Sequence, residues 1–172
     1  MTAALTGLAY ILVYLCNEHV LSFTRFADGV NWIYLPSGLR LTLVVIFGVP
    51  AAAGIAWAST LLSAWPHGWD SLAPALMTGM ISGGAPLLAL LWCRRVLKVQ
   101  ADLGGLQGRT LLGMAVIFAI VSAALHQLWY GWNEPSSDRA LQFAVMSMGD
   151  LLGTLVVLYL GYWILKRISV RP

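Results

Sequence analysis

The sequence predicts an all-α fold, a polytopic membrane bundle of about six transmembrane helices with both termini in the cytoplasm. Three observations lead to this prediction. Hydrophobic residues make up 59% of the chain and charged residues 10%, whereas a soluble domain carries about 25% charged residues. The mean hydropathy is +0.79, and long apolar stretches alternate with short polar ones along residues 1–172, which we treat as one membrane domain. The basic residues gather on one side of the predicted bundle.

Six stretches approach the roughly 20 apolar residues that cross a bilayer core. They are residues 3–22, 30–48, 50–65, 71–93, 110–130 and 141–165. The first has no basic leader and no A-x-A cleavage site, so we expect it to remain in the protein as a span. The third begins at a tight turn, Gly48-Val49-Pro50.

The fourth stretch carries helix-weakening residues near its middle. Gly83 and Gly84 precede Pro86, which removes a backbone donor and clashes with the preceding helical turn. We expect a kink or a short unwound stretch there, and a simple proline kink is the commoner outcome. Broken helices of this kind often mark binding sites in transporters.

Small residues recur at four-residue spacing in three stretches. The pairs are Gly54 with Ala58, Gly79 with Gly83, and Gly149 with Gly153. This spacing lets helix backbones approach closely in lipid. We favour packing within the chain over a dedicated dimer face.

The orientation follows from the lysine and arginine side chains that flank the spans. One side carries Arg94, Arg95, Lys98, Arg109, Lys166, Arg167 and Arg171, and the other carries Arg25 and Arg139. Cytoplasmic loops are enriched in such residues, so we expect cytoplasmic termini in a bacterial-type inner membrane. Aromatic anchors are expected at the outer face, at Trp32, Trp65, Trp69, Trp129, Tyr130 and Trp132.

Four ionisable residues fall within the predicted spans, all in the outer half of the membrane. They are Glu18, Arg40, His126 and Asp150, each from a different span. Intramembrane charges are costly and indicate function. We therefore predict one outward-facing polar cavity that contains all four.

The second stretch favours an anionic ligand. If its helix begins near Pro36, it is only about 13 residues long, and its N-terminal amides lie below the outer surface, where they favour an anion. Arg40 adds a guanidinium fork that suits a carboxylate or phosphate. The predicted ligand-binding set is Glu18, Asn31, Trp32, Ser37, Gly38, Arg40, His126 and Asp150. The alternative is an internal ion pair between Arg40 and Asp150 or Glu18 that only holds the bundle together.

The sequence lacks the motifs of common enzymes. We find no H-E-x-x-H, C-x-x-C, G-x-S-x-G or P-loop, and we expect no catalytic residue. His19, His67 and His126 lack metal-ligand spacing, so we expect no metal and no cofactor. No basic stripe indicates nucleic acid. The two cysteines, Cys16 and Cys93, are expected near opposite membrane faces and unpaired.

Two sequence blocks resemble a known family. The block W-I-Y-L-P-S-G-L-R-L-T-L-V-V-I-F-G (Trp32–Gly48) and the later M-G-D-L-L-G-T-L-V-V-L-Y (Met148–Tyr159) are similar to the opening and final helices of MASE1-type membrane sensor domains. The resemblance implies a helical membrane bundle and a sensory role, and it assigns family positions to Pro36, Gly38, Gly149, Asp150 and Gly153. This chain departs from the pattern at Arg40, is shorter, and shows no output domain.

We expect a stand-alone membrane sensor or scaffold subunit that acts through a membrane partner or a second copy of itself, with lipid around it. A small anionic ligand would occupy the cavity. The alternative is a small carrier or substrate-capture protein for an organic anion, which the polar cavity and the weakened fourth span favour.

Overall fold

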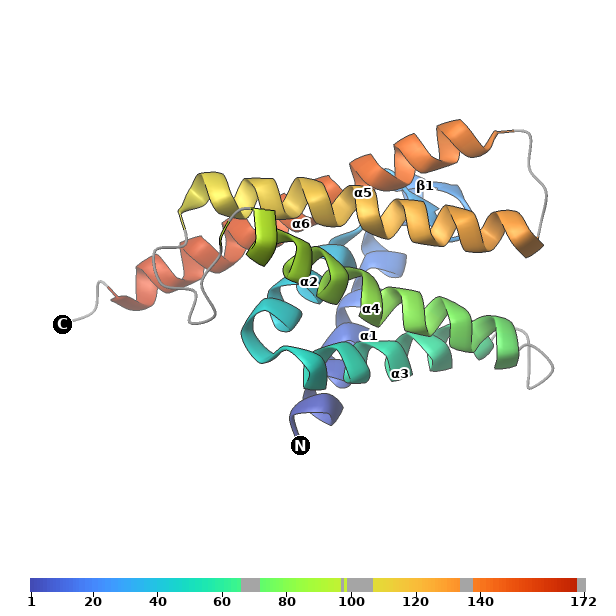
Figure 1. Cartoon of the computed structure of the whole chain (residues 1–172). Helices are drawn as coiled ribbons and strands as arrows, with labels where there is room; N and C mark the ends of the chain where they lie inside the picture. The colour runs from blue at the N-terminus through green and yellow to red at the C-terminus, as the bar shows by residue number, and fades with distance from the viewer. Residues whose placement is uncertain (66–71, 97, 99–106, 134–137, 170–172) are drawn as a thin grey trace.

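A computed structural model describes residues 1–65, 72–96, 98, 107–133 and 138–169 of the chain. Each of the six apolar stretches forms a helix (Figure 1). The helices are α1 (Thr2–Val20), α2 (Leu35–Phe47), α3 (Val49–Ala64), α4 (Leu72–Val96), α5 (Gly108–Asn133) and α6 (Arg139–Ser169). Within the described ranges, α1, α4, α5 and α6 are long and apolar enough to cross a membrane, whereas α2 and α3 are shorter, at 13 and 16 residues.

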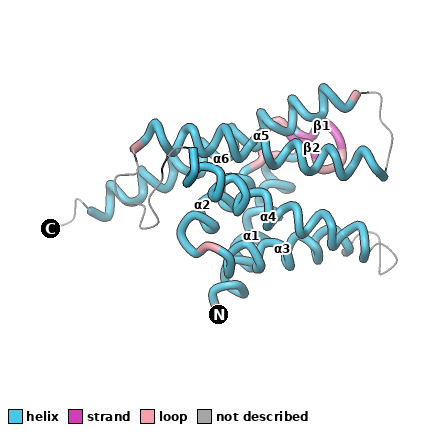
Figure 2. The backbone as a smooth tube through the Cα atoms, in the orientation of Figure 1, coloured by secondary structure: helices cyan, strands magenta, loops and turns pink. Residues whose placement is uncertain are grey.

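The predicted span over residues 30–48 is wrong at its start, and the fold is not purely helical. After α1 the chain forms a 3-10 turn, η1 (Ser22–Thr24), and a small antiparallel hairpin of β1 (Arg25–Ala27) and β2 (Val30–Asn31) (Figure 2). Asp28 and Gly29 make its turn, and Gly29 has a φ of +71°, which glycine adopts without a Cβ penalty. An Asp-Gly pair between two extended segments is a strong hairpin signal.

The helix start near Pro36 is confirmed. Helix α2 begins at Leu35 with Pro36 in its first turn and ends at Phe47. Gly48 then turns the chain with φ +64°, and Pro50 lies in the first turn of α3. Proline suits both places because its fixed φ is helical and the first turn needs no amide donor. A helix of 13 residues is about 20 Å long, short of the roughly 30 Å hydrocarbon core.

No unwound stretch interrupts the fourth helix, so the unwound alternative is wrong. Helix α4 runs from Leu72 to Val96 with Pro86 inside it. It packs tightly on α3: a Cβ at Gly83 would collide with the Ala52 carbonyl, and one at Gly79 with Thr60. This close contact stabilises the helical backbone that the sequence alone makes weak.

The other small-residue pairs also pack within the chain, as predicted. Gly54 of α3 lies against α1, where a Cβ would collide with the Ala3 carbonyl. Gly149 and Gly153 of α6 lie against the extended segment that leads into α2: a Cβ would strike the carbonyls of Asn31 and Tyr34, respectively. Helix α2 is thereby held among α1, α3, α4 and α6.

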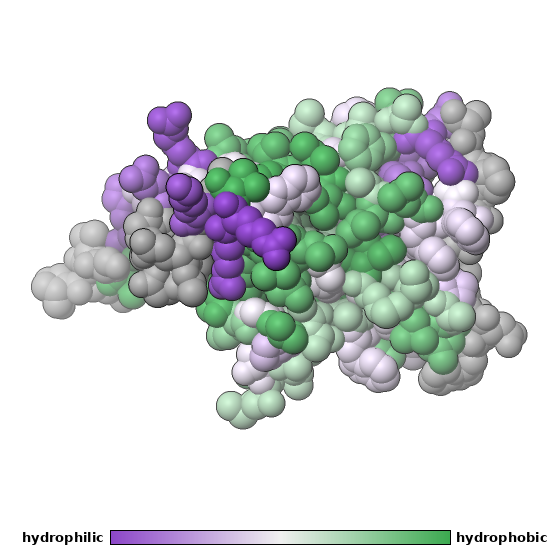
Figure 3. Space-filling view, viewed as in Figure 1, coloured by the Kyte–Doolittle hydropathy of each residue, from purple (hydrophilic) through white to green (hydrophobic). Residues whose placement is uncertain are grey.

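Charge and hydrophobicity are segregated along the molecule. Basic side chains occupy the end formed by the C-terminus of α4, the start of α5 and the last turns of α6, and Figure 3 shows hydrophilic residues gathered there beside an apolar surface. The strongly exposed Trp65 and Trp132 lie at the opposite end, whereas Trp92 and Trp163 are exposed near the basic end. The predicted Trp69 and Arg171, and most of the loop between α4 and α5, lie outside the described residues.

Candidate ligand-binding cavity

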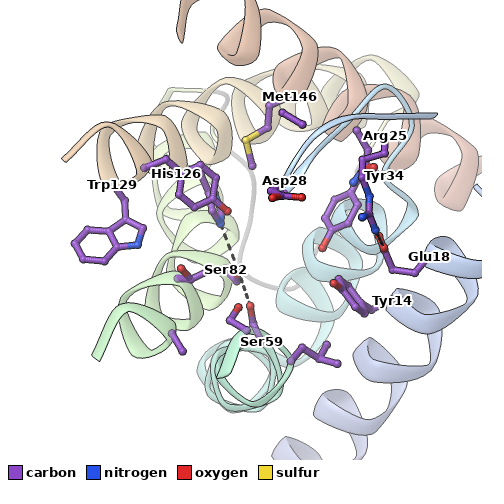
Figure 4. Close-up of a pocket in the computed structure, with 18 of the residues that line it drawn as sticks. Tyr14, Glu18, Arg25, Asp28, Tyr34, Ser59, Ser82, His126, Trp129 and Met146 are labelled. Carbon is purple, nitrogen blue, oxygen red and sulfur yellow. Dashed lines mark hydrogen bonds and ion pairs between the residues drawn. The ribbon is translucent and has the colours of Figure 1, made fainter. Parts of the chain in front are cut away.

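A cavity of about 1040 Å³ opens among the helices (Figure 4). It lies at the end of the molecule opposite the basic residues. All six helices and the hairpin contribute to its lining. Helices α1, α3 and α5 contribute residues from their C-terminal parts, whereas α2, α4 and α6 contribute residues from their N-terminal parts. Pockets that bind small organic molecules have volumes of roughly 300–1,000 Å³, so this cavity is large enough for such a ligand.

Four-residue spacing brings polar side chains to this cavity. Tyr10, Tyr14 and Glu18 of α1 line it one turn apart, and so do His126 and Tyr130 of α5. Residues four apart lie on one face of a helix. The same spacing recurs at Ser59 and Ser63 in α3 and at Thr78 and Ser82 in α4. The lining is therefore rich in hydroxyls and phenols.

Arg40 forms the floor of the cavity. Its side chain is 1% exposed, and its Nη2 donates to Asp150 Oδ1 at 3.3 Å, to Asp150 Oδ2 at 3.5 Å and to Ser122 Oγ at 3.4 Å. All three are long for charge-assisted bonds, which are about 2.7–2.9 Å. The guanidinium carbon lies 5.5 Å from the ring centroids of Tyr34 and Phe118. Among the described residues, Nε has no hydrogen-bond partner.

Asp150 lies behind Arg40 and does not line the cavity. It is 1% exposed, and its backbone carbonyl accepts bonds from Ser37 Oγ at 2.8 Å and Thr154 Oγ1 at 2.7 Å. The predicted ion pair between Arg40 and Asp150 is confirmed. Ser37 and Gly38 are buried in the contact between α2 and α6 and serve packing, with Gly38 against Gly153.

The predicted anion site at the start of α2 is wrong, because the protein itself satisfies those amides. Asn17 Oδ1 accepts a hydrogen bond from the Leu35 amide at 3.0 Å, and the Tyr34 carbonyl accepts one from the Ser37 amide at 3.2 Å. Pro36, between them, has no N–H. The sequence could not show that a buried asparagine of α1 caps α2.

The rim of the cavity carries a second ion pair. Glu18 of α1 pairs with Arg25 of β1 and does not reach Arg40. Asp28, at the hairpin tip, points into the cavity (Figure 4), and Asn31 lines it while being 7% exposed. Trp32 does not line it: it is 46% exposed and packs edge-on against Phe26, with ring centroids 6.2 Å apart.

One wall of the cavity is a hydrogen-bonded chain. Ser59 Oγ donates to Ser82 Oγ at 2.9 Å, and Ser82 Oγ lies 3.4 Å from His126 Nε2. His126 Nδ1 lies 2.9 Å from the Ser122 carbonyl, which can only accept. Ser122 thus joins the wall to the floor, since its hydroxyl contacts Arg40. His126 is a hydrogen-bonded side chain, 3% exposed, that also borders the cavity.

The structure therefore brings together half of the predicted set. Glu18, Asn31, Arg40 and His126 line the cavity, Asp150, Ser37 and Gly38 support it from behind, and Trp32 lies outside. The sequence analysis missed the tyrosines, the serines, Arg25 and Asp28. The four-residue spacing of Tyr10, Tyr14 and Glu18 was the available signal.

In the part of the chain that the structure describes, no group of three histidine, cysteine or acidic side chains could hold a metal ion. Cys16 and Cys93 are both free thiols. His67 lies outside the described residues. Comparison with known proteins identifies no relative: no family model matches the chain, no curated protein matches, and no solved structure matches.

Proposed function

We propose that this chain is a multi-pass inner-membrane receptor subunit that holds a small organic carboxylate in the cavity and acts through a membrane partner. The observation that carries the proposal is Arg40, a buried guanidinium on the cavity floor whose Nε has no hydrogen-bond partner among the described residues. Buried donors without a partner cost free energy, and a ligand carboxylate would supply the missing acceptor.

The chemistry of the floor suits a carboxylate. The planar guanidinium presents N–H donors in a fixed geometry, and a carboxylate accepts such charge-assisted hydrogen bonds well. Asp150 and Ser122 hold Arg40 from behind, through one nitrogen. Nε keeps its donor for a ligand, and the low dielectric of a buried site strengthens such a bond.

The proposal includes six crossings with cytoplasmic termini, and the cavity would then lie on the outer side of the membrane. The position of the basic residues supports this orientation, because they lie at the end opposite the cavity and positively charged ends stay in the cytoplasm. The MASE1-type blocks support a sensory role. Trp32–Gly48 forms the extended segment and α2, and Met148–Tyr159 forms the part of α6 that supports Arg40.

Ligand binding tests the floor directly. The purified full chain in detergent would be titrated with acetate, butanoate and hexanoate while the thermal unfolding midpoint is followed. We expect at least one to raise the midpoint. We expect Arg40→Lys, which keeps the charge beside Asp150 but loses the Nε donor, to weaken its binding about tenfold. Arg25→Lys at the rim is the matched control. Equal binding by the wild type and Arg40→Lys would contradict the proposal.

The partner is tested by mild extraction of the tagged protein at its native level, followed by mass spectrometry. A stoichiometric membrane protein in the eluate would support the receptor subunit. If the protein instead elutes alone and reconstituted vesicles accumulate the bound carboxylate, it is a carrier. The unbroken α4 removes the feature that favoured a carrier.

The orientation is tested with single cysteines in a chain without Cys16 and Cys93. Gln107→Cys lies beside the start of α5, and Trp65→Cys at the end of α3; both positions are exposed. In intact cells, a membrane-impermeant maleimide should label the cysteine at position 65 and not the one at 107. The reverse pattern would place the cavity inside.

A further inference from the structure

From the wall and the charges around Arg40, we infer that the carboxylate ligand is zwitterionic, an amino carboxylate whose ammonium group binds at Ser59, Ser82 and Asp28. This inference rests on the proposed function, since it assumes that the carboxylate end binds Arg40. It names the chemical class of the ligand.

The wall formed by Ser59, Ser82 and His126 presents hydrogen-bond acceptors to the cavity. The Ser122 carbonyl takes the Nδ1 proton of His126, so in the neutral ring Nε2 is an acceptor. Ser82 then donates its hydroxyl proton to Nε2, and Ser59 donates its own to Ser82. Both hydroxyl protons are used within the chain. What remains toward the cavity are oxygen lone pairs, which require a donor on the ligand.

The floor of the cavity, in contrast, presents hydrogen-bond donors. Arg40 has donors and no acceptor, and its Nε has no partner among the described residues. A ligand that satisfies both surfaces must carry an acceptor group at one end and a donor group at the other. A simple carboxylate has only the first.

The charge balance makes an ammonium the fitting donor. The lining carries two cations, Arg25 and Arg40, and two anions, Glu18 and Asp28. Asp150, directly behind Arg40, adds a third carboxylate. A simple carboxylate would add a net negative charge to a partly buried site, whereas a zwitterion adds no net charge. Asp28 points into the cavity between the two walls (Figure 4), so its carboxylate can face an ammonium.

Matched pairs of probes test the inference. Glycine, 4-aminobutanoate and 6-aminohexanoate would be compared with acetate, butanoate and hexanoate, which have the same chain lengths and no ammonium. Dissociation constants would be measured by tryptophan fluorescence of the full chain, since Trp129 lines the cavity. We expect one amino carboxylate to bind about tenfold or more tightly than its partner, the gain of one charge-assisted contact.

Variants locate the ammonium. Ser82→Ala and Asp28→Asn should each remove most of the difference within the best pair. Thr78→Val is the matched control, because Thr78 lines the same cavity one turn from Ser82 but donates its hydroxyl to the Pro74 carbonyl. Unfolding midpoints without ligand show whether each variant is folded, and Ser59→Ala offers a second wall variant if Ser82→Ala is not.

Each outcome separates the inference from the proposed function. Equal binding within every pair, still weakened by Arg40→Lys, would overturn the zwitterion and leave the carboxylate receptor. Equal binding of 4-hydroxybutanoate and 4-aminobutanoate would also overturn it, since any donor would then suffice. If no probe binds in an Arg40-dependent way, the proposed function fails and the inference fails with it.

Discussion

Two ion pairs border the cavity, and they differ in burial, in neighbours and in what they can do. On the floor, Arg40 and Asp150 are each 1% exposed and come from α2 and α6, far apart in sequence. At the rim, Glu18 and Arg25 are 20% and 49% exposed and lie seven residues apart. Water can replace either partner at the rim. At the floor both partners are buried from water, so loss of either one leaves a charge uncompensated.

The floor should respond most strongly to loss of one partner. Asp150→Ala leaves the Arg40 guanidinium buried without a counter-ion, and we expect a loss of about 3–5 kcal/mol in the free energy of unfolding. The measurement is detergent-induced unfolding of the purified protein. Asp28→Ala, which removes an exposed carboxylate beside the same cavity, should change stability little. If Asp150→Ala and Asp28→Ala lower the unfolding free energy by similar amounts, burial of the carboxylate does not determine its contribution to stability.

The packing of α6 beside Asp150 should have the second-largest effect on stability. Gly149→Ala places a methyl group on the Asn31 carbonyl, and we expect a loss of about 1–3 kcal/mol from overpacking. Gly161→Ala is the matched control in the same helix, since no atom lies within 4 Å of its Cβ position. That change should stabilise the helix by up to about 1 kcal/mol. If Gly149→Ala and Gly161→Ala lower the unfolding free energy equally, the close contact between α6 and the Asn31–Tyr34 segment is not the cause.

The cap that joins rim to floor should have a smaller effect. Asn17→Ala leaves the Leu35 amide of α2 without an acceptor, and we expect a loss of about 0.5–2 kcal/mol in unfolding free energy. Asn17→Asp keeps an acceptor oxygen and should retain more of the stability. If both variants unfold at the wild-type midpoint, the cap contributes nothing.

The rim should respond least. Glu18→Gln removes an exposed pair, and we expect a loss below about 1 kcal/mol, smaller still at high salt. A double-mutant cycle with Arg25→Gln, measured at low and high salt, isolates the pair from other effects of each change. A coupling energy as large as that of the floor would show that the rim pair is shielded from water.

Much of the candidate site follows from local sequence, and the rest from distant contacts. Glu18, Arg40 and His126 stand out because a charge in an apolar stretch is costly wherever it lies, and the structure does bring them to one cavity. The helix start at Pro36 was readable because proline has a fixed φ and no amide. The hairpin was missed although Asp28-Gly29 marks it, because the apolar residues after it extend the hydropathy signal of the second span backward.

By itself the sequence determined six apolar helices, the turn at Gly48, the basic end and the ionisable residues within apolar stretches, because these depend on composition and on residues a few positions apart. Only the tertiary structure decided that Arg40 pairs with Asp150 while Glu18 pairs with Arg25, that Asn17 caps α2, and that α4 stays helical through Pro86. Each of these depends on which backbones can approach closely. Glycines at the contacts between helices set that distance, and their partners lie elsewhere in the chain.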